Sequence, residues 1–188
     1  GKVGGNTIIT YRDRSYLFGW AAYGADRRVN LFGEPFYKFT TSGDSISYAG
    51  KGNWFQEVRT FIFGAKDSDA TIIFENGIDV DVSNSHWSGN SRGLYAVKGK
   101  AFVDARIMGV ITNANTGANS YCRIHKYGDG VIAYEGEYYL SRGDASEIVE
   151  GGLLINDKTE MSNWQVLTNA WLGGKGRIVD GNITVKTG

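Results

Sequence analysis

The sequence predicts an all-β fold of short antiparallel strands, arranged as a sandwich or as an intertwined β-structured fibre domain. Short runs rich in Val, Ile, Tyr, Phe and Thr recur along the chain, and clusters of Gly, Asp, Asn and Ser separate nearly all of them. Such runs and breaks are typical of strands joined by turns. The dipeptide Asn76-Gly77 lies between two of the runs and is the strongest short signal for a hairpin.

The expected strands follow these runs in chain order. They cover residues 6–11, 15–23, 27–32, 57–63, 70–75, 78–83, 101–112, 120–127, 131–140, 146–155, 164–172 and 181–186. One segment, residues 161–172, also fits a short helix, because Ser162 is a candidate N-cap and Trp164, Leu167 and Trp171 recur at helical spacing. A strand and a helix therefore both remain open for this segment.

The expected hairpin places Phe74 opposite Asp79 and Ile73 opposite Val80. Residues opposite one another share a face of the sheet, so the strand at 70–75 is apolar on both faces. Such a strand needs cover on both sides, as in a sandwich core or where another chain packs against it.

The composition indicates one folded domain. The 188 residues are 41% hydrophobic and 13% aromatic, which is too many for a disordered chain. We expect one β-rich domain, 1–188, with a candidate internal boundary near residues 88–94. Because the chain begins with Gly1 rather than Met and ends in a strand-like run, we also expect it to be a fragment of a longer fibre protein.

Charge and cysteine content exclude several classes of function. Twenty basic residues balance twenty acidic ones, so no electrostatic footprint favours nucleic acid or anionic lipid. Cys122 is the single cysteine, so no intrachain disulfide forms. No apolar run approaches the ~18 residues that a membrane span requires, and no signal-peptide pattern opens the sequence. We therefore expect neither nucleic-acid binding nor membrane insertion.

Two pairs of acidic residues are weighed as catalytic pairs. Asp79 and Asp81 lie two positions apart on an expected strand, and Glu135 and Glu137 repeat the spacing. This spacing is ~6.6 Å along a strand, which falls within the range of inverting glycosidases. However, such neighbours face one way rather than across a cleft, and alternating acid on a strand is usually a solvated face. We expect no catalysis.

Metal and nucleophile sites are also not expected. A Ca²⁺ site at Asp79, Asp81 and Ser83 is conceivable, but the twelve-residue loop with its glycine and final glutamate is absent. Cys122 and His125 are three residues apart on an expected strand, so they face opposite sides and cannot act together. The sequence predicts no metal and no cofactor.

A binding loop is expected around Trp87. This tryptophan lies in "SNSHWSGNSRG" without an apolar neighbour, and its flat ring suits stacking on a sugar or anchoring a protein. Asn84, His86, Asn90 and Arg92 would supply directional hydrogen bonds around it. The alternative is that Trp87 plugs its own hairpin or seals a contact between chains. The other tryptophans are expected in the core: Trp20, Trp54, Trp164 and Trp171.

A recurring unit joins an aromatic or apolar residue, a Gly/Asp-rich turn and a short apolar strand. Four segments contain it, and their irregular spacing argues against a solenoid of fixed period. They are "AAYGADRRVNLFGE" (21–34), "FIFGAKDSDATIIFENG" (61–77), "HKYGDGVIAYEGE" (125–137) and "RIVDGNITVKTG" (177–188).

The best copies of this unit resemble tail-fibre and tailspike proteins of tailed bacteriophages. The pattern "FGxDGxLxxxG" is matched by "YGDGVIAYEG" (127–136) and "VDGNITVKTG" (179–188), and the loop "TNANTGANS" (112–120) is also similar to that family. The copies in the first half lack the Asp-Gly step, and the His-x-His metal motif of some fibre tips has no counterpart. The resemblance covers about half of the chain.

The resemblance implies a virion protein located outside the cell. Members of that family are elongated homotrimers that contact other fibre segments and adhere to bacterial surface glycans or outer-membrane receptors. The expected function is therefore non-catalytic attachment to the host surface. Two alternatives remain open: a glycan-binding β-sandwich, such as a lectin or carbohydrate-binding module, and a glycan-degrading enzyme domain.

Overall fold

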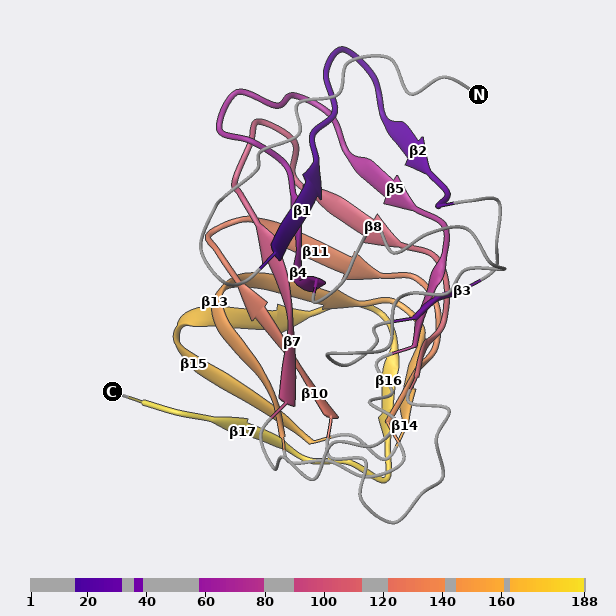
Figure 1. Ribbon diagram of the computed structural model, residues 1–188. Helices are drawn as coiled ribbons and strands as arrows, with labels where there is room; N and C mark the ends of the chain where they lie inside the picture. The colour runs from indigo at the N-terminus through magenta and orange to yellow at the C-terminus, as the bar shows by residue number, and fades with distance from the viewer. Residues whose placement is uncertain are drawn as a thin grey trace.

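The computed structural model describes residues 16–31, 36–38, 58–79, 90–112, 122–140, 145–160 and 163–187. Within these ranges every regular element is a strand. The strands wind around one axis as successive turns of a coil, from the indigo end to the yellow end of the chain (Figure 1). Each turn contributes to three faces, which we name the first, second and third face.

The first face contains β1 (Tyr16–Trp20), β4 (Val58–Phe63), β7 (Asn90–Ala96), β10 (Cys122–Tyr127), the first halves of β13 (Ser146–Ile155) and β15 (Trp164–Gly173), and β17 (Ile183–Val185). The second face contains β2 (Arg27–Val29), β5 (Ile72–Phe74), β8 (Ala105–Ile107), β11 (Val131–Tyr134) and the second halves of β13 and β15. The third face contains β3 (Phe36–Lys38), β6 (Gly77–Asp79), β9 (Ile111–Thr112), β12 (Tyr138–Tyr139), β14 (Lys158–Glu160) and β16 (Arg177–Val179).

All ladders between these strands are parallel, so the antiparallel sandwich or intertwined fibre fold expected from the sequence is wrong. Each strand pairs with its equivalents one turn earlier and later, and an isolated antiparallel bridge joins Ala22 to Ala70. The first and second faces form one eleven-stranded sheet that bends within β13 and β15, and the third face is a six-stranded sheet. Among the described residues the chain is a parallel β-helix, a solenoid in which each turn packs on its neighbours.

The expected hairpin at Asn76-Gly77 does not form. β5 pairs with β2 and β8 on the second face, whereas β6 pairs with β3 and β9 on the third face. Asn76 is buried at the corner between these faces, where its Oδ1 accepts a hydrogen bond from the Leu31 amide at 2.7 Å. An Asn-Gly step that suits a tight turn thus serves as a corner of the coil.

The recurring Gly-turn unit marks corners of the coil, and the turns of this solenoid have no fixed period, as the irregular spacing of the unit indicated. Gly24, Gly64 and Gly128 have φ values of 71°, 82° and 79° and lie where the chain passes from the first to the second face. Glycine adopts such backbone angles without strain. The spacing of the unit is irregular because successive turns differ in length, as shown by the equivalent inward positions Phe61, Leu94, Lys126, Ile148 and Val166.

The core fills the interior of the coil with stacked apolar side chains. At one end Trp20 packs against Phe61, Phe63 and Phe74, with ring centroids 5.5–5.9 Å apart. At the other end Tyr134, Tyr138 and Trp164 form a second aromatic cluster. Each aromatic pair contributes about 0.5–1.5 kcal/mol beyond burial of its area.

The helix considered for residues 161–172 does not form over the described part of this segment, where β15 runs from Trp164. Its Trp164 and Val166 side chains point into the core. In addition, none of the described residues form a helix with the length and apolar character that a bilayer-spanning segment needs.

Candidate binding face on the outer side of the coil

The structure places few of the predicted binding residues. Asn84, His86 and Trp87 lie outside the described residues. Asn90 begins β7, but its side chain is likewise outside the description. Arg92 is only 4% exposed and shares the inward side of β7 with buried residues, so its guanidinium belongs to the interior of the first face.

The candidate acidic pairs are separated or outside the description. Asp81 and the side chain of Asp79 are not described. Glu135 ends the second face, where Asn156 donates a hydrogen bond to it at 3.1 Å, whereas Glu137 begins the third face. A corner of the coil therefore lies between Glu135 and Glu137, so the two do not stand side by side on one strand.

The strand after the predicted loop borders a group of titratable side chains on the first face. Ile124 and Lys126 are buried on the inward side of β10, so the alternation of a strand turns His125 and Tyr127 outward. In the register of the sheet, His125 lies beside Glu147 of β13, and Tyr127 lies beside Tyr95 of β7.

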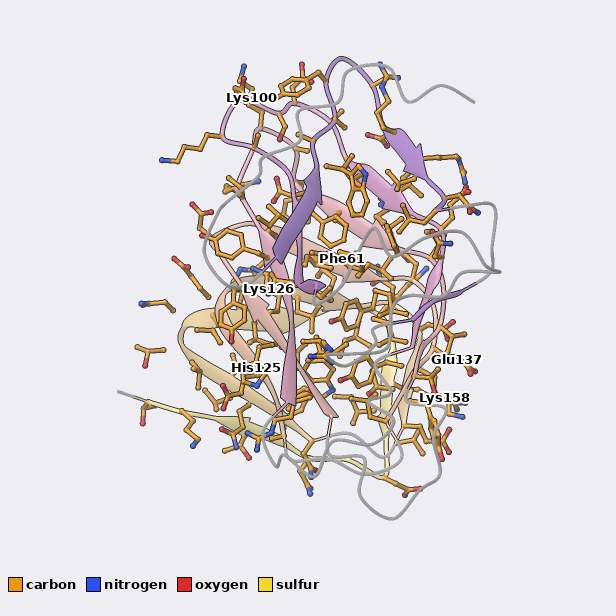
Figure 2. All side chains as sticks on the ribbon, viewed as in Figure 1. Phe61, Lys100, His125, Lys126, Glu137 and Lys158 are labelled. Carbon is orange, nitrogen blue, oxygen red and sulfur yellow. The ribbon has the colours of Figure 1, made fainter. Side chains whose placement is uncertain are left out.

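Polar contacts connect three of these side chains. Nδ1 of His125 lies 3.1 Å from the Tyr127 hydroxyl and 3.4 Å from Oε2 of Glu147. A neutral imidazole with its proton on Nδ1 donates toward these oxygens and keeps Nε2 as an acceptor. The Nε2 atom is buried and has no hydrogen-bond partner among the described residues. Figure 2 labels His125 and its neighbour Lys126 of β10.

Burial governs the protonation of this group. It lowers the pKa of His125 below its ordinary value, although the carboxylate of Glu147 works in the opposite direction and Arg123 lowers the pKa further. Burial, and then Glu147, raise the pKa of the Tyr127 hydroxyl. At neutral pH the network therefore contains a neutral imidazole and a neutral phenol held by one carboxylate.

The imidazole is less exposed than the side chains around it. The His125 side chain is 13% exposed, whereas that of Glu147 is 27% exposed and Tyr95 is 38% exposed. The face thus presents an aromatic ring beside a carboxylate whose orientation is fixed. Such a surface can stack on an apolar ring face and accept hydrogen bonds from hydroxyl groups.

The tryptophans occupy different environments. Trp164 is fully buried, which confirms its expected place in the core, and Trp20 packs against the core from its edge. Trp171 is 40% exposed, so the prediction that it is a core residue is wrong. Trp164 and Trp171 lie on either side of the bend of β15, Trp164 on the inward side and Trp171 on the outward side.

Comparison with known proteins does not assign the fold or the face to a family. The chain matches no protein-family model, no curated protein and no solved structure. Among the described residues, no group of three or more His, Cys, Asp or Glu side chains is arranged to hold a metal ion.

Proposed function

We propose that this chain is a non-catalytic host-attachment domain of a phage tail fibre or tailspike, and that it binds a bacterial surface glycan. The observation that carries the proposal is the exposed ring of Tyr95 next to the Tyr127–His125–Glu147 network. Aromatic rings flanked by fixed polar groups are typical of sites that bind ligands by stacking and hydrogen bonding. The resemblance of the corner motifs to tail-fibre proteins supports the same function.

Binding fits this face better than catalysis does. A general base must lie within reach of the proton that it abstracts, but Nε2 of His125 is buried behind the surface. A hydrogen-bonded imidazole that fixes a tyrosine and a glutamate is instead suited to holding a preorganised surface, which lowers the entropic cost of binding.

The test is binding to purified lipopolysaccharide and capsular polysaccharide from a panel of bacteria. Tyr95→Ala should weaken binding by about tenfold, the equivalent of about 1.4 kcal/mol, because stacking is lost. Tyr139→Ala is the matched control, since Tyr139 is a similarly exposed tyrosine (36%) on the third face. Equal binding by Tyr95→Ala and the unchanged protein, or shortening of the glycans during incubation, would contradict the proposal.

We also propose that the chain assembles as a homotrimer, as the resemblance implies. The three faces of one chain enclose the described core, so we propose that whole coils associate side by side, with cyclic symmetry. Light scattering coupled to gel filtration should give a mass of three 20.6 kDa chains. A stable species with the mass of one chain at micromolar concentration would rule the trimer out.

A further inference from the structure

We infer that Trp171 is a stacking platform for a pyranose ring of a glycan, on a different face from the Tyr95 network. The inference rests on the proposed function only for the class of its ligand. Trp171 lies on the outward side of β15 within the second face, in register with Gly152 of β13. At 40% exposure, it is the most exposed tryptophan among the described residues.

Glycine holds the indole against the sheet. A Cβ built on Gly152 would lie 2.2 Å from Cζ2 and 2.4 Å from Cε2 of Trp171, so the ring occupies the space that any other side chain would need. Gly173, on the same side of β15, leaves the neighbouring position free of a side chain as well. The indole therefore packs on the sheet at Gly152, and no side chain at position 173 covers it.

An apolar cluster lies on the strands next to the platform on the second face. Val131 is in register with Gly152, and Ala133 is in register with Leu154. Val103, Val131 and Ala133 form a small apolar cluster outside the main core, and Leu154 packs against it. The three cluster residues are buried, whereas Leu154 is half-buried and lies in register with Gly173 of β15. Leu154 therefore supplies apolar surface near the ring, which suits the less polar face of a pyranose.

A polar group lies further along the same strands. Asn156 donates a hydrogen bond to Glu135 at 3.1 Å and accepts one from the Lys175 amide at 3.4 Å. Nε of Arg106 lies 3.9 Å from Glu135 on its other side. The side chains of Asn156, Glu135 and Arg106, together with the backbone amide of Lys175, offer both donors and acceptors for sugar hydroxyl groups.

The distance between Trp171 and the polar group at Asn156 indicates a ligand longer than one sugar. Asn156 follows Gly152 by four residues on β13, a distance of ~13 Å along a strand. A glycan that stacks one ring on Trp171 and runs parallel to β13 would reach the polar group with a later sugar. We therefore assign the second face to an oligosaccharide rather than to a free monosaccharide.

The experiment is a titration of the full chain with neutral hexose oligosaccharides and with the matching methyl monosaccharides. Isothermal calorimetry should show that the oligosaccharide binds about tenfold or more tightly than the monosaccharide. Trp171→Ala should weaken oligosaccharide binding by about tenfold, the equivalent of about 1.4 kcal/mol, whereas Trp171→Phe retains a flat ring and should lose less. Gly152→Ala should also weaken binding, because its Cβ displaces the indole without removing it.

Two further measurements separate this inference from the proposed function. The indole N–H resonance of Trp171 in the unchanged protein should shift on titration with the oligosaccharide. The resonance is identified by its disappearance from the spectrum of Trp171→Phe. Because the shift is measured in the unchanged protein, it does not depend on how well the Trp171→Ala variant folds. Tyr95→Ala should leave that shift unchanged. If Tyr95→Ala abolishes attachment to polysaccharide while oligosaccharides leave the Trp171 resonance unmoved, the proposed function stands and the platform is refuted. A self-association that Trp171→Ala removes would show a contact between copies and would also overturn the inference.

Discussion

Gly151 leaves open the space that the ammonium group of Lys126 occupies. A Cβ built on Gly151 would lie 2.6 Å from Nζ of Lys126 and 2.5 Å from the carbonyl oxygens of Gly128 and Gly130. Nζ donates hydrogen bonds to both of these carbonyls and to that of Glu150 at 2.5–2.7 Å. A buried lysine thus joins the corners of two successive turns, and Figure 2 labels it among the strands of the first face.

Lys126→Met should destabilise the coil by about 1–3 kcal/mol. The methionine retains an apolar stem, but buried carbonyl oxygens lose their charged donor, and unsatisfied buried acceptors are costly. Lys100→Met is the matched control, because Lys100 is exposed and such surface changes stay within about 0.5 kcal/mol. Urea unfolding followed by circular dichroism measures both variants. Equal midpoints would show that the three hydrogen bonds contribute nothing to stability.

Gly151→Ala should destabilise the protein more than Gly24→Ala does. Both glycines have positive φ, 66° and 71°, so each substitution carries a backbone cost of about 1–2 kcal/mol. A Cβ at Gly24 meets no atom within 4 Å, whereas at Gly151 it collides with the lysine clamp. The difference between the two variants in thermal or urea unfolding isolates the collision. A cost at Gly151 no larger than at Gly24 would contradict the packing described for Lys126.

The stability of the protein should rise between pH 8 and pH 10 because of Lys126. Burial lowers its pKa from 10.5 to about 8, against the opposing effect of Glu150, Asp104 and Asp129. In this interval the unfolded chain still holds a proton that the folded protein has released, so the free energy of unfolding increases with pH. The slope approaches about 1.4 kcal/mol per pH unit.

Urea unfolding at several pH values checks this prediction, with Lys126→Met as the comparison. The variant lacks the titrating amine, so its stability should not share the rise. The raised pKa of Tyr134 acts in the opposite direction as the pH approaches its ordinary value of 10.0, so the rise is clearest in the lower half of the interval. Parallel pH profiles for the two proteins would show that Lys126 titrates normally.

The positions of most strands followed from the sequence, but their partners did not. Alternation along a strand shows which residues share a face, and it is equally compatible with antiparallel and parallel neighbours. The segment at β5 illustrates this ambiguity. Ile72 and Phe74 point into the coil and Ile73 is half-buried outside, a pattern that was attributed to the two sheets of a sandwich. In a parallel coil both neighbours of β5 lie one turn away in sequence, beyond the reach of local turn rules.

The candidate sites show a similar limit. The sequence places His125 and Cys122 on opposite sides of a strand, but the contact of His125 with Glu147 depends on the pairing of β10 with β13, which no local pattern specifies. The outward position of Trp171 could not be predicted by alternation from buried Trp164, because β15 bends and its pairing with β13 shifts register between these two residues. The contact between Trp171 and Gly152 could not be predicted either, because it depends on the register of β13 and β15.

Asn76→Gly distinguishes the coil corner from the hairpin that the sequence predicted. In a type I′ turn, glycine is favoured at both central positions, so the change would be neutral or stabilising. In the coil, fully buried Asn76 accepts a hydrogen bond from the Leu31 amide at 2.7 Å and donates to the Leu31 carbonyl at 3.2 Å. Loss of both bonds and the added backbone freedom of glycine should cost about 2–3 kcal/mol.

Asn30→Gly is the matched control, because Asn30 is exposed and contacts Nδ2 of Asn76 only at 3.5 Å through its side chain. Its backbone cost should be about 1 kcal/mol at most, since no buried hydrogen bond of comparable geometry is lost. Urea unfolding of the two variants gives the comparison directly. An Asn76→Gly protein as stable as the unchanged chain would favour the hairpin and contradict the parallel coil at this corner, because only the coil requires the amide side chain.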